Sequence, residues 1–383
     1  MTATGKMEIL AIFNAKGGVG KTTSAVNLAA CFAAMGRRTV VFDLDAQGNA
    51  TTSLGVSKTP ATGTYDVIVG KAAIKDTLTP TFMDGLFLVG ATKNLATVDV
   101  DLALGEHKSG VIRQVIEPIA DDFDILIMDC APTFGSMTIN ALVSADAILI
   151  PTQPSPFAHD GLLRTWTILS RIRTELHPGL KTLGILPTFC NPNEVFGADG
   201  IHENEIMAAM KAEFGNQLHD IGIPMDTQTF TTAAAIGLPA CVYAPESDAA
   251  GAYLDIAHRI LGETPVTDAA PEIAGRIGEI PSRFHRFDDP PPANGNDKDR
   301  TRARLKAWQQ IADEKGMLDA RVNVPPVDGD ALQQASYIPP DPGVDASAST
   351  WLSLSRAFIL IGGALLLGTL AFLAGWVFGS GML

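Results

Sequence analysis

The sequence predicts an α/β domain built on a mostly parallel sheet flanked by helices, and two observations lead to this fold class. From Met7 to about Gly262, short apolar runs alternate with amphipathic stretches of helical length. This rhythm is typical of parallel strands joined by crossover helices. Several of the apolar runs are unbroken, as expected for strands that are buried on both faces of a sheet.

The strands and helices are expected where apolar character and stop signals agree. The predicted helices include Thr22–Met35, ended by Gly36, and Gly161–Leu176, ended near Pro178. The predicted strands are Glu8–Phe13, Thr39–Asp43, Leu86–Val89, Asp124–Asp129, Ala147–Ile150 and Lys181–Pro187.

Composition narrows the class of protein. The chain has 383 residues and a formal net charge of −14, a poor match for a protein whose whole surface binds nucleic acid, although a local basic patch stays possible. Its four cysteines are far apart with no C-x-x-C pair, and no signal peptide precedes them. We therefore expect a reducing cytosol, with the thiols acting as small buried apolar groups.

The C-terminal part divides into a linker and a hydrophobic segment. Residues 263–350 are rich in Pro, Asp, Ala and Ser and are expected to be mostly disordered, apart from a short helix of unknown purpose at about 299–315. Residues 357–378 carry no charge, and as a helix they are long enough to cross a bilayer. Arg356 precedes them, which places the N-terminal domain in the cytoplasm, on the inner face of the cytoplasmic membrane, in a single-pass protein.

A glycine-rich turn follows the first predicted strand and precedes the first predicted helix. It reads Asn14-Ala15-Lys16-Gly17-Gly18-Val19-Gly20-Lys21-Thr22-Thr23. Backbone N–H groups in such a turn, together with a helix N-terminus, bind phosphate. Lys21 is suited to the β and γ phosphates of ATP, and the Thr22 hydroxyl is suited to direct Mg²⁺ ligation. Ala15 stands where the common phosphate-binding pattern has its first glycine, and a second lysine, Lys16, precedes the glycines.

This variant resembles the ParA/MinD family of deviant Walker-motif P-loop ATPases, which partition DNA or position large assemblies. The resemblance covers about Lys6 to Gly262. Its further motifs follow in the family's order: Val40–Thr51 resembles switch I, Ile125–Pro132 resembles the Walker B strand with switch II, and Thr138–Leu142 and Ile150–Pro154 come after them.

The resemblance implies a role for each matching position. Lys16 matches the lysine that reaches the phosphates of the partner subunit in an ATP-bound homodimer, and Asp45 matches the carboxylate that orients the attacking water. Asp43 and Asp129 match the residues that hold Mg²⁺ through its water shell. Lys16, Lys21 and Asp45 are thus the expected catalytic residues. The expected nucleotide-binding residues are Lys16, Gly17, Gly18, Val19, Gly20, Lys21, Thr22, Thr23 and Asn191, the last because Thr188–Asn193 resembles the loop that packs on adenine.

The chain departs from the resemblance in two places. DNA-binding members carry arginines in the segment that corresponds to Ile221–Tyr243, which here has neither Lys nor Arg, so non-specific DNA binding is in doubt. Arg164, Arg171 and Arg173 form either a substitute patch or a solvated helix face. The second departure is the tail: family members usually end near the position of residue 262 here or contact membrane through a short amphipathic helix, whereas this chain adds a linker and a hydrophobic span.

Several functions remain open at this point. The first is a partitioning or positioning ATPase tethered to the membrane, with slow hydrolysis stimulated by an activating or cargo protein. The alternative is a membrane-bound nucleotide switch, or a scaffold that does not hydrolyse ATP, serving an envelope machine without DNA partition. Iron-protein-like reductases need two cluster cysteines per subunit, and only Cys130 is suitably placed. Bacterial tyrosine kinases have a Tyr-rich tail, and here the tail has only Tyr337.

Overall fold

A computed structural model describes residues 7–56, 60–104, 110–155, 158–191, 193, 195–196, 201–262 and 297–318. All of these residues belong to one compact unit, Met1–Pro326, and a second unit comprises Val327–Leu383. The predicted membrane span at 357–378 and most of the predicted linker lie outside the described residues. Among the residues that are described, none forms a helix both long and apolar enough to cross a bilayer.

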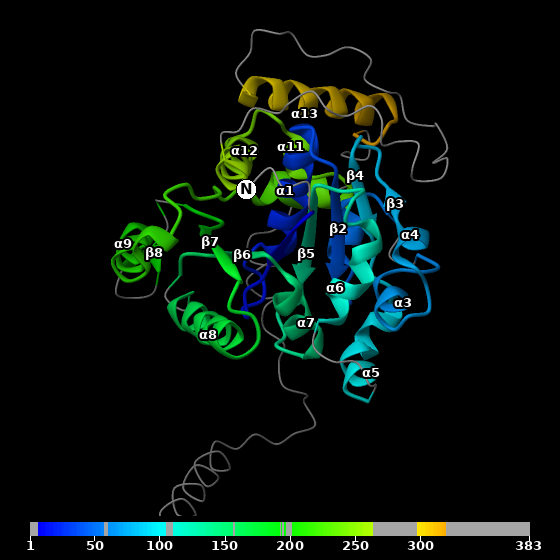
Figure 1. Ribbon diagram of the computed structural model, residues 1–383. Helices are drawn as coiled ribbons and strands as arrows, with labels where there is room; N and C mark the ends of the chain where they lie inside the picture. Colours follow the sequence, from blue (N-terminus) through cyan, green and yellow to red (C-terminus); the bar gives the residue numbers. More distant parts are fainter. Residues whose placement is uncertain are drawn as a thin grey trace, which may run out of the picture. The chain divides into compact units, whose positions relative to one another are not determined.

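The central sheet has seven strands in the order β3-β4-β2-β5-β1-β6-β7 (Figure 1). Every neighbouring pair is parallel except β3 with β4. The predicted mostly parallel sheet is confirmed, and each of the six predicted strands has a counterpart within two residues at either end. The strands are β1 Glu8–Ile12, β2 Thr39–Leu44, β3 Thr79–Pro80, β4 Leu86–Val89, β5 Ile125–Cys130, β6 Ala147–Thr152 and β7 Lys181–Pro187, and a separate hairpin pairs β8 Val195–Phe196 with β9 Ile201–His202.

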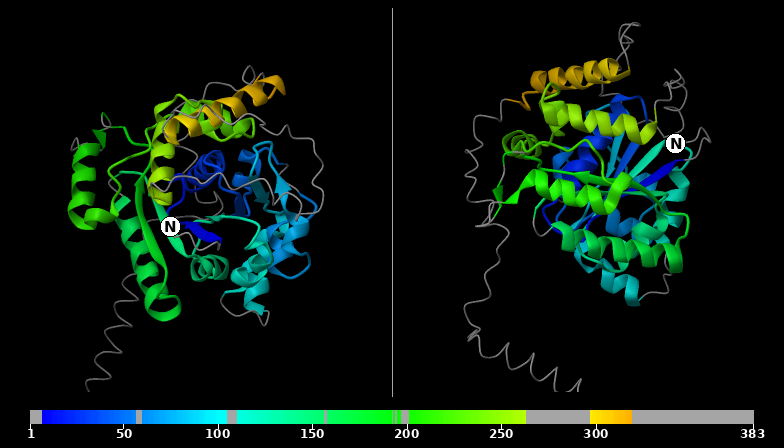
Figure 2. Two further views of the ribbon diagram at one scale, coloured as in Figure 1. Left: turned by 45° about the horizontal axis from the view of Figure 1, so that its top comes forward. Right: turned by 90° about the vertical axis from the view of Figure 1, so that its left-hand side faces the viewer.

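Helices cover both faces of the sheet, which explains why its strands are apolar on both sides (Figure 2). In β1, Leu10 and Ile12 join the core under α1 and α10 to α13, whereas Ile9 and Ala11 join the core under α3 to α9. The helices are α1 Lys21–Ala34, α2 Asn49–Ser53, α3 Thr64–Ile68, α4 Ile74–Thr77, α5 Val98–Leu104, α6 Val111–Ile116, α7 Ser136–Ser144, α8 Ala158–Arg171, α9 Glu203–Phe214, α10 Thr227–Ala235, α11 Ala240–Tyr243, α12 Asp248–Leu261 and α13 Asp297–Glu314.

The strand order brings three carboxyl ends together at one edge of the sheet. Strand β5 lies between β1 and β2, and Asp129 of β5 is in register with Asp43 of β2 and with Ile12 of β1. The chain leaves β1 directly into the glycine-rich turn. Open α/β sheets bind their ligands at this edge, so the topology places two buried carboxylates beside the predicted phosphate loop.

Helix α13 packs against the domain that precedes it in the chain, lying along α1, α11 and α12 (Figure 1). Its Leu305 and Trp308 are each 1% exposed and belong to the same core as α1 and α12. Arg304 Nη1 donates to the carbonyl of Ala34 at the end of α1 (3.0 Å), and Gln309 Nε2 donates to the carbonyl of Tyr243 (2.7 Å). The helix of unknown purpose therefore completes an apolar face of the α/β domain.

Candidate functional site

The glycine-rich turn has the backbone that an anion site requires. Gly18 and Gly20 have φ values of 73° and 79°, a region that favours glycine. Helix α1 begins at Lys21 with no side-chain cap and no acidic residue in its first turn. The first N–H groups of a helix need partners from outside it, so these are available to phosphate oxygens, which the helix dipole also attracts.

Lys21 is already directed toward this loop. Its side chain is 7% exposed, and Nζ donates to the carbonyl of Lys16 at 2.8 Å. Burial lowers the pKa of Lys21, while the nearby carboxylates of Asp129 and Asp45 oppose that shift. A buried ammonium group beside free helix N–H groups can neutralise phosphate charge without first losing a shell of bulk water.

Asp129 has the surroundings expected of a carboxylate that faces a cation. It is fully buried, and neither carboxylate oxygen has a hydrogen-bond donor in good geometry among the described residues. Burial and the neighbouring Asp43 raise its pKa well above the usual range, and nearby Thr22 and Lys21 oppose that rise. Apart from the nearby Thr22 hydroxyl, this buried carboxylate has no donor placed for it among the described residues, which is costly unless a cation or its water shell is present, so Asp129 and Thr22 fit Mg²⁺.

Magnesium characteristically takes few protein ligands and keeps several waters and phosphate oxygens. The described ranges contain no group of three or more His, Cys, Asp or Glu side chains placed to hold a metal. Thr22 would supply the direct protein ligand, and the carboxylates would act through bound water.

Asp43 lies beside Asp129 but is engaged with its own chain. Its Oδ2 accepts hydrogen bonds from the Thr51 backbone N–H (2.8 Å) and hydroxyl (2.6 Å), and its Oδ1 accepts from the Asp45 N–H (3.1 Å). Burial raises its pKa to about 6, against the three hydrogen bonds that lower it. Asp43 therefore stabilises the turn from Asp45 to Thr51 through these hydrogen bonds. Any contact with a water molecule bound to Mg²⁺ would be additional to them. Sequence reasoning did not identify Thr51.

Asp45 stands in that turn, half buried at the rim of the site. Its Oδ1 accepts a hydrogen bond from the Gln47 N–H at 2.9 Å. Its backbone N–H donates to Asp43, which is in register with Asp129, and its negative charge favours the protonated forms of Lys21, Asp43 and Asp129 and so acts to raise their pKa values. A carboxylate in this place can orient a water molecule beside bound phosphate.

Lys16 is not directed toward this group of side chains. Its Nζ donates to the Ser155 hydroxyl, in the segment after β6, at 3.3 Å. Only its backbone carbonyl contacts Lys21. The structure thus brings together Lys21, Thr22, Asp43, Asp45 and Asp129, and it turns the Lys16 ammonium group away from them.

The loop after β7 supports the phosphate loop from the other side. The Thr188 hydroxyl donates to the carbonyl of Val19 (3.0 Å), and a Cβ placed on Gly20 would lie 3.3 Å from the Phe189 ring. Asn191 uses its side-chain oxygen locally, as acceptor for the Asn193 N–H (3.2 Å), and its own N–H donates to Glu203 (2.8 Å). Its predicted contact with adenine stays a prediction.

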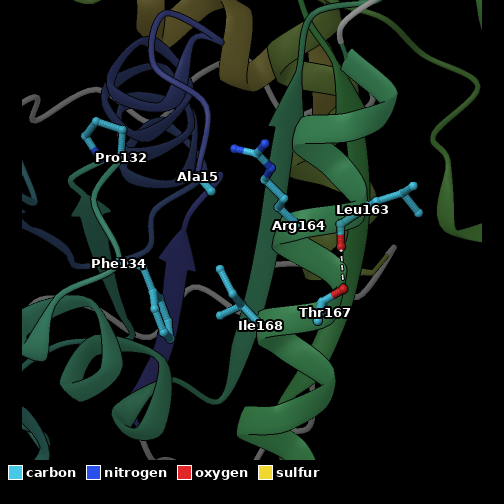
Figure 3. A pocket seen from close by; sticks show the side chains of 7 residues that line it. All are labelled: Ala15, Pro132, Phe134, Leu163, Arg164, Thr167 and Ile168. Carbon is cyan, nitrogen blue, oxygen red and sulfur yellow. Dashed lines mark hydrogen bonds between the residues drawn. The ribbon is translucent and has the colours of Figure 1, made fainter. Parts of the chain in front are cut away.

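A shallow apolar groove lies beside the phosphate loop, between the segment after β5 and helix α8 (Figure 3). Phe134 and Leu163 are 47% and 39% exposed. Arg164 extends across the groove toward Ala15 (Figure 3). The groove is lined by Ala15, Pro132, Phe134, Leu163, Arg164, Thr167 and Ile168.

The arginines of the α8 region do not gather into one free basic patch. Arg171 pairs with Glu175 one turn further along (3.2 Å), and Arg173 Nε donates to the carbonyl of Leu180 (2.9 Å). Arg164 faces the groove. These contacts favour the interpretation of a solvated helix face over that of a DNA-binding surface.

Residues 7–182 match a family model described as an AAA domain. The chain is 33% identical over 254 residues to the sporulation initiation inhibitor protein Soj of Bacillus subtilis, covering 66% of this chain and 98% of that protein. It is 32% identical over 258 residues to the chromosome partitioning protein ParA of Caulobacter vibrioides, covering 67% and 94%.

A solved structure adds ligands to this comparison. Cobyrinic acid a,c-diamide synthase from Mycobacterium smegmatis, with a bound ATP analogue and magnesium, superposes with a TM-score of 0.55 and 27% identity. The match covers 67% of this chain and 94% of that structure.

Proposed function

The chain belongs to the ParA/MinD family of P-loop ATPases, and from this premise we propose that it is an ATP-dependent dimerising ATPase that partitions or positions a cargo. ATP and Mg²⁺ are its nucleotide and metal, consistent with the ligands of the solved structure described above. One observation carries the proposal: Lys21, Thr22, Asp45 and Asp129 meet at the phosphate loop, whereas the Lys16 ammonium group is turned away from it.

The arrangement assigns a task to each group. The free N–H groups of α1 and the Lys21 ammonium bind phosphate oxygens, and Asp45 orients the attacking water. Thr22, together with Asp43 and Asp129 through water, would hold Mg²⁺, which would supply positive charge to the transferring phosphoryl group. Lys16 completes the site of a second copy, so that hydrolysis requires the dimer. Phosphoryl transfer depends mainly on position and charge, so these groups are sufficient.

Replacing Asp45 with alanine is expected to stop hydrolysis while leaving ATP binding and dimerisation intact, because Asp45 faces the water and Lys21 faces the phosphates. The loss of turnover should be about 10²-fold or more, the order found for removing one positioned catalytic group. Phosphate release and fluorescent-nucleotide titration measure the two quantities, with Asp121→Ala as a control at an exposed aspartate. Normal turnover in Asp45→Ala would show that another group orients the water.

Non-specific DNA is not expected to be the surface on which this ATPase works. The absence of Lys and Arg from Ile221 to Tyr243 and the paired Arg171 both support this. Anisotropy titration of the ATP-bound protein with duplex DNA at physiological salt should show little binding. Micromolar, strongly salt-dependent binding that falls in Arg164→Ala would instead favour ordinary DNA partition.

We propose the cytoplasmic membrane as the surface that takes the place of DNA, with residues 357–378 as a single span and the ATPase unit in the cytoplasm. Liposome flotation of the full chain against a chain ending at Leu318 tests this, and equal flotation would contradict it. The second candidate function, a membrane-bound nucleotide switch for an envelope machine, is favoured by the same missing basic residues. It would require an activating partner but no DNA.

A further inference from the structure

The two residues that precede the glycines, Ala15 and Lys16, have their backbone N–H groups held by side chains. The Thr165 hydroxyl of α8 accepts from the Ala15 N–H at 3.1 Å, and Asn14 Oδ1 accepts from the Lys16 N–H at 3.0 Å. Thr165 is 0% exposed and Asn14 is 1% exposed. The start of the phosphate loop is therefore fixed by buried side chains from β6–α8 and from the loop itself.

The orientation of the Asn14 amide is determined by its partners. Its Nδ2 donates to the carbonyl of Pro151 (2.8 Å) and to the Thr152 hydroxyl (3.1 Å). A carbonyl can only accept and an N–H can only donate, so Oδ1 must face the Lys16 N–H. The Thr165 hydroxyl also lies 3.1 Å from Asn14 Oδ1 and 3.0 Å from the Gly161 carbonyl. The ends of β1 and β6 and the first turns of α8 are thus joined in one buried network.

The side chain of Lys16 rests on the same part of the chain. Its Nζ contacts the Ser155 hydroxyl, and a Cβ placed on Gly161 would lie 3.5 Å from Lys16 Cβ and 3.6 Å from its Cδ. The Lys16 side chain is therefore contacted by Ser155 at its Nζ and by Gly161 along its aliphatic stem, and Thr165 holds the backbone of the preceding residue, Ala15. Lys21 Nζ donates to the Lys16 carbonyl, but Lys21 is itself the first residue of α1, so its backbone is held by that helix.

We propose that Thr165 is a positioning residue for Lys16, a role that rests on the function proposed above for Lys16 across the dimer. Its hydroxyl holds the backbone at the residue before Lys16 and so sets the point from which the Lys16 side chain, whose Nζ here contacts Ser155, would reach a second copy. Without that hydroxyl the partly buried Ala15 N–H loses its acceptor, and the cost of leaving this donor without a partner favours a shift of the loop. Nucleotide binding depends on the later part of the loop, from Gly17 to Thr22, and is retained.

The experiment compares Thr165→Val with Thr165→Ser in the full chain in detergent. Valine keeps the shape of threonine and removes the hydroxyl, whereas serine keeps the hydroxyl. Thr165→Val should lower kcat for ATP hydrolysis about tenfold or more, since small displacements of a reacting group have effects of this order, with the Kd for ATP within about twofold. Thr165→Ser, which keeps the hydroxyl, should have a kcat close to that of the wild type. Thr167→Val is the matched control, because the Thr167 hydroxyl also donates one turn back, to the Leu163 carbonyl, but on the surface.

Lys16→Ala, measured in parallel, separates the two proposals. If Lys16→Ala hydrolyses ATP normally, the proposed cross-subunit function is wrong. If Lys16→Ala is inactive but Thr165→Val retains wild-type kcat, or loses ATP affinity as strongly as kcat, then Thr165 does not position Lys16 and this inference is overturned. Thr165→Ala, which leaves space instead of a methyl group, replaces Thr165→Val if the valine variant does not fold, and the same outcomes decide.

Discussion

Replacing Lys21 with alanine is expected to lower ATP affinity about a hundredfold or more. The ammonium group is buried beside uncapped helix N–H groups, and its removal leaves the β and γ phosphates without their nearest buried cation. Losing one partner of a buried charge pair costs about 2–5 kcal/mol, which corresponds to a factor between tens and thousands in Kd. Fluorescent-nucleotide titration measures the loss.

The exposed lysine Lys93 provides the control for this experiment. Lys93→Ala should bind ATP as the wild type does, so a loss confined to Lys21→Ala reports on the site and not on net charge. Tight ATP binding by Lys21→Ala would mean that the phosphates are held elsewhere.

The second large effect is expected far from the nucleotide, at Trp308. This side chain is 1% exposed between α13 and the core, although its indole N–H has no hydrogen-bond partner among the described residues. Trp308→Ala should reduce the free energy of unfolding by about 3–5 kcal/mol, as for other large-to-small changes of buried aromatic residues. Chemical denaturation of residues 1–318 measures it.

Two further variants sharpen the test of α13. Trp308→Phe should lose much less stability, because it keeps most of the apolar contact and removes the unpartnered N–H. Gln310→Ala, at an exposed position of the same helix, should change stability by less than about 0.5 kcal/mol. If Trp308→Ala is as stable as the wild type, α13 does not dock on the ATPase unit in solution.

The sheet was predictable because each main strand is a run of apolar residues with its own boundaries. Strand β3 was not predicted, since two residues ending in Pro80 carry no periodicity. The predicted strand Ala147–Ile150 continues to Thr152, where Pro151 and Thr152 pair in register with β7. Because proline has no N–H for the sheet, a proline favours ending a predicted central strand just before it. Here the pairing of Pro151 and Thr152 with β7 extends the strand past that point.

The site was predictable where the residue type itself carries the chemistry. Lys21, Thr22 and Asp129 are recognisable because a phosphate loop and a strand ending in aspartate have fixed places in this fold. Thr51 and Thr165 are not, because a hydroxyl becomes a partner of Asp43 or Ala15 only through distant contacts that neither spacing nor composition encodes. The packing of α13 against α1, α11 and α12 likewise depends on contacts between residues far apart in the sequence.

ATP-dependent dimerisation through Lys16 is the claim on which the account depends most, and sedimentation velocity tests it directly. Residues 1–318 carrying Asp45→Ala should sediment as a dimer with ATP and Mg²⁺ and as a monomer with ADP. The dimer is expected because the variant does not hydrolyse its bound ATP and Lys16 is intact. Adding Lys16→Ala to the same chain should return it to a monomer with ATP still bound. A monomer in ATP with Lys16 intact, or a dimer that survives the loss of Lys16, would contradict the account.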